Sequence, residues 1–302
     1  MRGKLWMLSC LLVLGGTVLV GCGDDDGGGG DAGMGETDAG GGPSQPVATV
    51  EGGGAPDFEC LGNVTAPAAG DPVAFTATFT GPLNPMLPDG TVVEFFTANE
   101  IAGTCTAPGC VTATTTGNVA SVSLPANAFF AYRVPMTSAT APTIGYFRPA
   151  PAAAGENTSQ TVIGNTVLNV IPGLFNRTRL PGTTVVSGAA YDCQDRAVGG
   201  VEARVFIDGE RVVQGTERTD PFVGYLDGAA PNGMTFTTVP GAQFAVANVD
   251  PGTTRLELWA VLAEGEEPTR IACEEFASVA DAVMVVAPPV LRSDYPEGSG
   301  CR

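Results

Sequence analysis

Short segments in which apolar and polar residues alternate cover most of the chain after residue 57. The segment 73–80, for example, reads Val-Ala-Phe-Thr-Ala-Thr-Phe-Thr, which places apolar side chains on one face of a β-strand. Gly, Pro, Asn and Asp separate these segments at short intervals, as expected for turns between strands. The pattern therefore predicts an all-β fold made of tandem β-sandwiches. The expected strands are 73–80, 91–97, 119–124, 129–134, 143–148, 184–192, 201–207, 243–248, 254–262, 269–276 and 282–286.

One segment departs from this pattern. Residues 159–171 carry apolar side chains at partly helical spacing, and Pro172 and Gly173 end the run. We expect a short helix here, within a connector that links two sandwiches. The expected units are an N-terminal sandwich at 58–150, the connector at 151–182 and a second sandwich at 183–302, each sandwich long enough for a core of its own.

The N-terminus carries a basic stretch with Arg2 and Lys4, followed by a mostly apolar run of 17 residues. This order is typical of a signal peptide, which would be residues 1–21. The run ends in Leu-Val-Gly-Cys at 19–22, which resembles the lipobox of bacterial lipoproteins. The resemblance implies that Cys22 is lipidated with diacylglycerol and anchors the mature chain to the (outer) membrane of a bacterial cell envelope. The alternative is an uncleaved membrane-spanning anchor, but a bilayer requires about 20 apolar residues.

Residues 23–57 contain 13 glycines and six aspartates, with few apolar side chains. Such a composition cannot bury enough surface to offset the entropy of ordering the chain. We therefore expect residues 22–57 to form the lipidated cysteine and a flexible linker, with an r.m.s. length of about 30–35 Å. The aspartates at 24–26 lack the glycine and glutamate spacing of a calcium loop, so a solvated spacer is favoured over a calcium site.

Charge and missing residue types limit the chemistry of the chain. It has 14 basic and 32 acidic residues and no histidine, for a net charge of −18. Removing residues 1–21 takes away Arg2 and Lys4, which lowers the net charge to −20 and leaves no lysine. This balance argues against nucleic acid and anionic lipid surfaces as partners. The missing residue types exclude histidine-based triads, histidine metal ligands and lysine nucleophiles. We expect no enzyme activity, no cofactor and no metal.

Six cysteines remain once Cys10 and Cys22 are set aside, and an even number in an exported chain indicates disulfides, with 15 possible connectivities. The favoured pairs are Cys105–Cys110, Cys193–Cys273 and Cys60–Cys301. The first pair would close a small turn. The second would close a long loop and contribute about 4 kcal/mol. The third joins the two cysteines that are left.

The second unit resembles a known family. Its opening segment 186–203 and its run 235–252, with paired threonines, a phenylalanine and Asn-Val-Asp-Pro-Gly, are similar to the carboxypeptidase regulatory-like domains. This resemblance implies a transthyretin-like β-sandwich that serves as an interaction, adhesion or stabilising module. Asp195 and Ala197 stand where the family usually has a turn glycine and proline. Residues 208–233 are longer than the corresponding family segment and are interpreted as an insertion.

These features favour a binding or structural role in the cell envelope, with the membrane reached through the lipid anchor and a protein or glycan as further partner. The candidate contact loops are 81–90 and the insertion 208–233. In the insertion, Phe222 and Tyr225 either form an exposed aromatic pair or fill the core, and the core is favoured. Trp259 is also favoured as a core residue over a glycan-binding platform.

Two alternatives remain open. One is a glycosidase-like hydrolase that uses two carboxylates, which would have to face each other in a cleft at about 5–9.5 Å. Its candidate carboxylates are Asp192, Asp195, Asp220 and Asp227. The other alternative is an adhesin that is stabilised by calcium bound to loop aspartates.

Overall fold

The computed structural model describes residues 44–302 except 98–100, 102, 107, 229, 289 and 296, and the side chains of 147–149 are not described. These described residues form strands, connecting turns and one helix. The predicted all-β sandwich fold is confirmed. Every one of the expected strands is present, although the segment 184–192 is divided into two strands.

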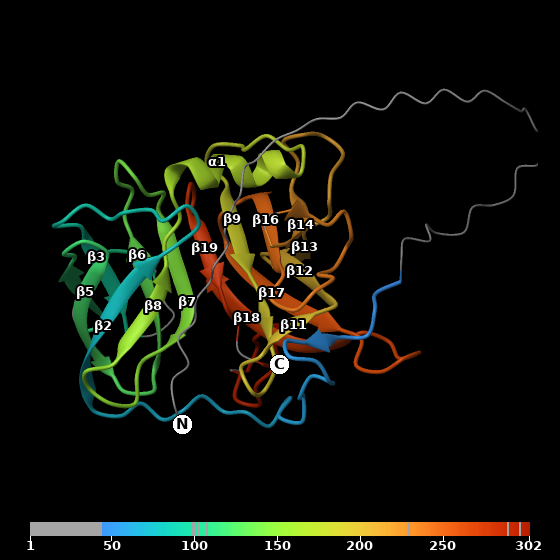
Figure 1. Cartoon of the computed structure of the whole chain (residues 1–302), viewed down its shortest axis with the longest axis horizontal. Coiled ribbons are helices and arrows are strands. Elements are labelled where there is room, and N and C mark those ends of the chain that lie inside the picture. Colours follow the sequence, from blue (N-terminus) through green and yellow to red (C-terminus); the bar gives the residue numbers. More distant parts are fainter. Residues whose placement is uncertain are drawn as a thin grey trace, which may run out of the picture.

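A nine-stranded sheet runs through the whole molecule and contains strands from both units (Figure 1). From edge to edge, its strands are β15 (Ala230–Pro231), β14 (Phe222–Asp227), β16 (Gln243–Val249), β9 (Thr184–Gly188), β19 (Val283–Val286), β7 (Thr143–Pro149), β6 (Phe129–Val134), β3 (Val92–Phe96) and β4 (Cys110–Thr114).

Three smaller sheets complete the fold. The three-stranded sheet of the first unit consists of β5 (Val119–Pro125), β2 (Pro72–Thr80) and β8 (Asn157–Thr161). The four-stranded sheet of the second unit consists of β13 (Glu210–Arg211), β12 (Val201–Ile207), β17 (Thr253–Ala260) and β18 (Thr269–Ala277). A small sheet joins β1 (Thr49–Val50), β11 (Ala197–Gly199) and β10 (Ala190–Tyr191).

Two cores lie on opposite faces of the nine-stranded sheet. In β6, Phe130 and Tyr132 pack against Phe75 and Phe79 of the three-stranded sheet, with ring centroids 6.0 and 5.7 Å apart. Their neighbour Ala131 belongs to the other core. Because successive side chains of a strand point to opposite faces, the three-stranded and four-stranded sheets cover opposite faces of the large sheet.

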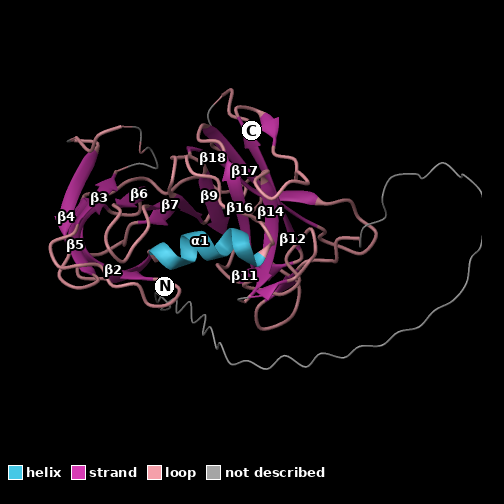
Figure 2. Cartoon of the chain, turned by 90° about the horizontal axis from the view of Figure 1, so that it is seen from above, coloured by secondary structure: helices cyan, strands magenta, loops and turns pink. Residues whose placement is uncertain are grey.

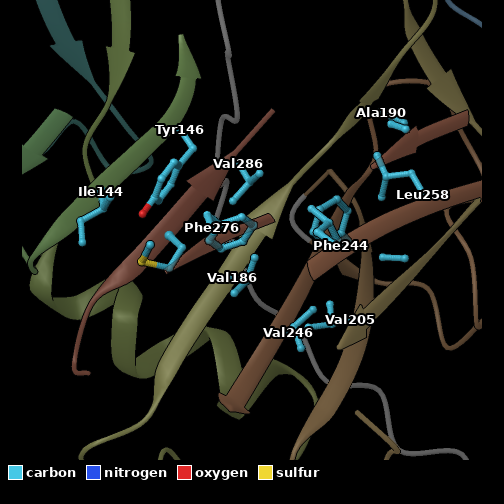
Figure 3. Packing of buried hydrophobic residues seen from close by; sticks show 14 of the residues in the cluster. Ile144, Tyr146, Val186, Ala190, Val205, Phe244, Val246, Leu258, Phe276 and Val286 are labelled. Carbon is cyan, nitrogen blue, oxygen red and sulfur yellow. The ribbon is translucent and has the colours of Figure 1, made fainter. Parts of the chain in front are cut away.

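The second core fills the space between the nine-stranded and four-stranded sheets. Val186 and Phe244 lie in one buried cluster with Leu258 of β17 (Figure 3). Tyr146 of β7, a strand of the first unit, packs its ring 4.9 Å from that of Phe276 in β18. The first unit therefore contributes side chains to the core of the second.

Strand β19 joins the two units. It pairs in parallel with β7 on one side and with β9 on the other, so that Met284 lies between Ile144 and Val186. Its sequence Val-Met-Val-Val is nearly all buried, as is typical of a parallel strand covered on both faces. A strand close to the C-terminus thus makes one continuous sheet of the two halves.

The helix α1 (Asn165–Leu174) lies across one end of the molecule, over the strands of the second half (Figures 1 and 2). Its Leu168 and Ile171 pack against Phe222 and Val283. The expected helix in the connector is confirmed, but it begins after 159–161, which belong to β8, and Pro172 lies within its last turn.

Residues 44–57 belong to the fold, which corrects the prediction that the flexible linker includes them. Gln45 donates a hydrogen bond from Nε2 to the carbonyl of Gly200 at 2.8 Å. The two residues of β1 pair with β11, and Val50 is buried. The prediction of a flexible linker rested on the glycines around β1. The short apolar segment between them nevertheless forms a strand, because it pairs with β11.

The described cysteines form three disulfides, Cys60–Cys193, Cys105–Cys110 and Cys273–Cys301. The prediction of Cys105–Cys110 is confirmed, and the predictions of Cys193–Cys273 and Cys60–Cys301 are wrong. Cys193 follows β10, where its N–H donates to the carbonyl of Asp57 in the N-terminal segment at 2.9 Å. Cys273 lies in the middle of β18 and is fully buried beneath the C-terminal residues.

Replacing Cys60 and Cys193 together by serine should lower the free energy of unfolding by about 5 kcal/mol, because a loop of 133 residues is no longer closed in the unfolded chain. The matched double change at Cys105 and Cys110, only five residues apart, should cost about 2 kcal/mol. Urea unfolding of both variants measures the difference, and equal losses would contradict the assignment of the long-range disulfide.

The change Met284→Ala should cost about 2–5 kcal/mol, because it opens a cavity at a fully buried position of β19. Amide hydrogen exchange should accelerate in β7 and β9 together, since both pair with this strand. The control is Met234→Ala at a 40 % exposed position. Acceleration confined to β9 would show that the two units are stabilised independently.

Candidate functional sites

The outer face of the four-stranded sheet carries a network of paired charges. Alternation along β12 turns Ala203 and Val205 into the core and Glu202 and Arg204 outward. The Glu202 carboxylate accepts hydrogen bonds from Arg204 at 2.6 Å and from Arg211 at 2.9 Å. One carboxylate therefore holds two guanidinium groups in place.

Trp259 lies on this outer face, which corrects its assignment to the core. Its ring is half-buried, and the guanidinium of Arg204 lies over it at 4.2 Å from the ring centroid. The indole N–H donates to Glu257 at 3.0 Å. The Arg204 guanidinium therefore occupies one face of the ring on which a sugar could otherwise stack.

A second carboxylate holds the other half of the network. The side chain of Glu257 is only 6 % exposed and forms ion pairs with Arg255 at 3.1 Å and Arg270 at 3.2 Å. Arg255 in turn stacks over Phe206 at 4.0 Å from the ring centroid. Two cations compensate the buried charge, so this part of the network is structural.

A shallow hollow of about 260 Å³ opens beside Glu202, Arg204 and Arg211. Tyr225 also lines it, and its hydroxyl accepts the N–H of Ala203 at 2.9 Å, while burial raises the pKa of the phenol. The remaining lining residues are Ala203, Val212, Val213, Gln214, Val223 and Thr235. This arrangement can bind a small polar or acidic group through its guanidinium groups, and sequence reasoning missed it because its arginines lie on different strands.

The segment 208–233 is part of the sheets, which corrects its interpretation as an insertion loop. It contains β13, β14 and β15, and β14 is a strand of the nine-stranded sheet. Phe222 and Tyr225 are 1 % and 3 % exposed. The prediction that both rings fill the core is confirmed, and they do not form an exposed pair.

Asp192 is a buried carboxylate with five donors. It accepts the N–H groups of Asp57, Gln194 and Arg196 and two side-chain hydrogen bonds from the Arg196 guanidinium, at 2.6–3.0 Å. Burial opposes its charge, but these donors outweigh burial and hold the pKa of Asp192 below its usual range. It ties the N-terminal segment to the β10–β11 turn beside the Cys60–Cys193 disulfide, and no lone pair is left for chemistry on a substrate.

The other three candidate carboxylates are not brought together as a facing pair. Burial and the nearby charge of Asp192 raise the pKa of Asp195, which occupies the same turn. Asp220 accepts the N–H of Glu217 at 2.8 Å, and Asp227 accepts hydrogen bonds from Thr238. Asp220 lies two residues before β14 and Asp227 is its last residue, so at least about 16 Å of strand separates their backbones.

A further carboxylate, Glu274, was not expected from the sequence. Burial beneath the C-terminal segment raises its pKa to about 7, against the opposing influence of Arg292 at 3.8 Å. Arg292 also pairs with Asp294 at 3.0 Å and lies over the ring of Tyr295. Arg292 thus forms ion pairs with two carboxylates at once, those of Glu274 and Asp294. Only the fold reveals this cluster, because β18 and residues 292–295 are distant in sequence.

Several sequence predictions fall outside these sites. Cys22 and the aspartates at 24–26 lie outside the described residues. Over the part of the chain that is described, no three His, Cys, Asp or Glu side chains are grouped so that they could bind a metal ion. Within the same part, no helix has the length and apolar character needed to cross a bilayer. The loop 81–90 contains no strand or helix and exposes two apolar side chains, Leu83 and Met86.

Comparisons with known proteins leave the family open. No protein-family model and no curated protein matches the chain. Solved structures match only weakly. The TIE protein of Bacillus anthracis is 11% identical with a TM-score of 0.22, over 72% of this chain and 34% of that chain. The shaft pilin SpaA of Lactobacillus rhamnosus GG is 13% identical with a TM-score of 0.21, over 72% and 98%. The minor pilin GBS52 of Streptococcus agalactiae is 10% identical with a TM-score of 0.22, over 76% and 99%.

This chain therefore spans about a third of the length of the Bacillus anthracis chain. At such TM-scores these likenesses assign neither a family nor a function, and the fold class stands on the strands and cores described above.

Protonation of Glu274 should make stability depend on pH. Its pKa is about 7 in the folded chain and near 4.5 in the unfolded chain, so the folded state binds the proton more tightly. The stabilisation is complete below pH 4.5 and is lost as pH rises through 7, by up to about 3 kcal/mol.

Glu274→Gln should remove this part of the decline, while Glu297→Gln, at a side chain that is 93 % exposed, should leave it unchanged. Unfolding free energies at pH 5 and pH 8 test this. A decline of the same size in Glu274→Gln as in the original chain would refute it.

Proposed function

We propose that this chain is a lipid-anchored protein of the bacterial cell envelope whose β-sandwiches have a binding or structural role and no catalytic one. The observation that carries the proposal is the Leu-Val-Gly-Cys sequence at 19–22, directly after a basic stretch and an apolar run. Since Cys22 lies outside the described residues, the anchor rests on this sequence alone.

The disulfides support export from the cytoplasm. All six cysteines after Cys22 pair with one another in the fold. Disulfides form and persist in oxidising compartments such as the bacterial periplasm or the cell surface. An exported chain with a lipobox would meet that environment.

The structure shortens the expected spacer between lipid and fold. The sequence alone suggested a linker to residue 57, but contacts with the fold begin at Gln45. Residues 23–43, which remain for a linker, lie outside the described residues.

The second unit has features in keeping with a carboxypeptidase regulatory-like sandwich, which we propose as its finer assignment. The Asn-Val-Asp-Pro-Gly run begins at Asn248, whose φ is +58°. Its side chain accepts the N–H of Leu180 and donates to the carbonyl of Thr178, both at 2.9 Å. Asparagine tolerates this backbone conformation better than most residues, which gives the motif a physical reason. The hollow beside Arg204 and Arg211 is the proposed contact for a protein or glycan partner.

Cys22→Ser should abolish lipid attachment and move the chain from the membrane fraction to the soluble fraction or leave it unprocessed. Cys10→Ser is the matched control, because Cys10 lies in the expected signal peptide and should have no effect. The measurements are cell fractionation and mass spectrometry of the N-terminal peptide. An unmodified N-terminal peptide that still begins at Met1, on a chain that remains in the membrane, would favour the membrane-spanning anchor instead.

A further inference from the structure

The hollow beside β12 has an excess of positive charge. Its charged lining consists of two guanidinium groups, those of Arg204 and Arg211, and one carboxylate, that of Glu202, and we call it the arginine hollow. The other lining side chains are neutral, and burial raises the pKa of Tyr225, so that its phenol carries no charge either. Two positive charges and one negative charge leave an excess of +1 here, whereas the whole chain has a net charge of −18. The arginine hollow therefore attracts an anion on a protein that otherwise repels anions.

Both guanidinium groups have hydrogen-bond donors left for a ligand. Among the described residues, Arg204 and Arg211 each form hydrogen bonds with Glu202 alone, at 2.6 and 2.9 Å. A guanidinium has several N–H donors in one plane, so most of them are unused. The Nε–H of Arg204 is buried without a partner, which is unfavourable until an acceptor reaches it. Arg211 is 53 % exposed and therefore accessible.

The other arginines on the outer face of this sheet are already occupied. Arg255 and Arg270 share the buried carboxylate of Glu257. Arg270 also donates to the carbonyls of Gly300 and Cys301 at 3.2 and 2.9 Å, so the C-terminal residues cover it. Recognition of an anion on this face is therefore expected at the arginine hollow.

An extended peptide does not fit the arginine hollow as an added strand. Strand addition needs free backbone N–H and C=O groups along a sheet edge. On the side of β12 that faces the hollow, the N–H of Ala203 already donates to the Tyr225 hydroxyl at 2.9 Å. The carbonyl of Val205 accepts the N–H of Val212 at 2.8 Å. A ligand must therefore be recognised through side chains.

The neutral part of the lining suits a sugar ring. Gln214 and Thr235 are exposed and place an amide and a hydroxyl beside the guanidinium groups, and both can exchange hydrogen bonds with sugar hydroxyls. Val213, which is 75 % exposed, offers apolar surface to the C–H groups of a ring. The volume of about 260 Å³ is smaller than that of clefts that enclose a drug-sized ligand, so one ring of a longer glycan fits it.

The charge of the hollow favours a carboxylate over other anions. An excess of one positive charge matches a monoanion, and the fork of a guanidinium matches the two oxygens of a carboxylate. A phosphate monoester carries close to two negative charges at neutral pH. A densely charged polyanion would be repelled by the net charge of −18 on the chain. An isolated carboxylate, such as that of a uronic acid within a neutral glycan, avoids both problems.

We propose that the arginine hollow binds the carboxylate of an acidic sugar unit, a uronic acid, in a glycan of the cell envelope. This inference rests on the proposed binding role of the sandwiches and names the class of ligand. Arg204 and Arg211 donate to the sugar carboxylate, and Gln214 and Thr235 contact its hydroxyls. Glu202 competes with the ligand for both guanidinium groups and keeps them in place when the hollow is empty.

Trp259 can report on binding, because the guanidinium of Arg204 lies 4.2 Å from the centroid of its ring. A carboxylate bound to Arg204 changes the charge above the ring and should shift the tryptophan fluorescence. The chain has two tryptophans, and the other one, Trp6, lies in the expected signal peptide. The change Trp6→Phe therefore leaves Trp259 as the sole emitting tryptophan.

The first measurement titrates the full-length Trp6→Phe chain, purified in mild detergent, with methyl glucuronide and methyl galacturonide. The controls are methyl glucoside and methyl galactoside, in which a hydroxymethyl group replaces the carboxylate. At least one uronide should shift the Trp259 emission saturably, with an affinity about tenfold or more above that of its neutral counterpart. Equal affinities, or no saturable shift with either uronide, would overturn the proposal. Tighter binding of N-acetylglutamate amide would assign the hollow to an acidic peptide and overturn it as well.

Matched variants locate the contact. Arg211→Ala should weaken uronide binding about tenfold or more, because it removes charged donors from an exposed position. The control is Arg302→Ala, at a side chain that is 58 % exposed, which should have no effect. Glu202→Gln should tighten binding, because the competing charge is gone. Unchanged binding in Arg211→Ala, or weaker binding in Glu202→Gln, would contradict the proposal.

The two proposals can fail separately. None of these titrations depends on lipidation of Cys22, and the fractionation of Cys22→Ser does not depend on the arginine hollow. Loss of uronide binding with an intact anchor would refute the glycan contact alone.

Discussion

The fold depends on the pairing of β19 with strands on both of its sides. Without this strand, β7 and β9 would be two unpaired edges inside the molecule, and their N–H and C=O groups would lack partners away from water. Because β19 pairs with both, the first and second units share one sheet, and Tyr146 of the first reaches the core of the second. The two sandwiches are therefore halves of one cooperative structure, although the chain between them is long enough to separate them.

Segments near both ends of the described chain also attach to the second unit. After β19, the chain returns across β18, where Tyr295 donates to the carbonyl of Cys273 and the Cys273–Cys301 disulfide covers the strand. Where the described residues begin, β1 and Asp57 attach to the β10–β11 region. Both ends of the described part of the chain are thus held on the second unit, and the strands of the first unit lie between them in sequence.

The sequence predicted those features that depend on neighbouring residues. Alternation located the long strands, and the spacing of Cys105 and Cys110 was sufficient for their disulfide. It did not predict β1, because Thr49 and Val50 form a strand only by pairing with residues 198–199. The other disulfides and the Glu274–Arg292 cluster were missed for the same reason, since their partners are distant in the chain. Trp259 was misplaced because alternation shows that a residue faces one side of a sheet, but not whether a guanidinium covers that side. No candidate site beyond Cys22 was specified by local pattern.

The position of the Cys60–Cys193 disulfide has a mechanical consequence. Tension applied at the N-terminus reaches β1 first and then Cys60, from which a covalent bond transfers it directly to Cys193 in the second unit. The 132 residues between these cysteines, which include the whole first sandwich, lie outside that load path. If force acted between the N-terminus and a partner bound to the second unit, only the segment before Cys60 would extend. The first sandwich would stay folded, because the disulfide carries the force past it.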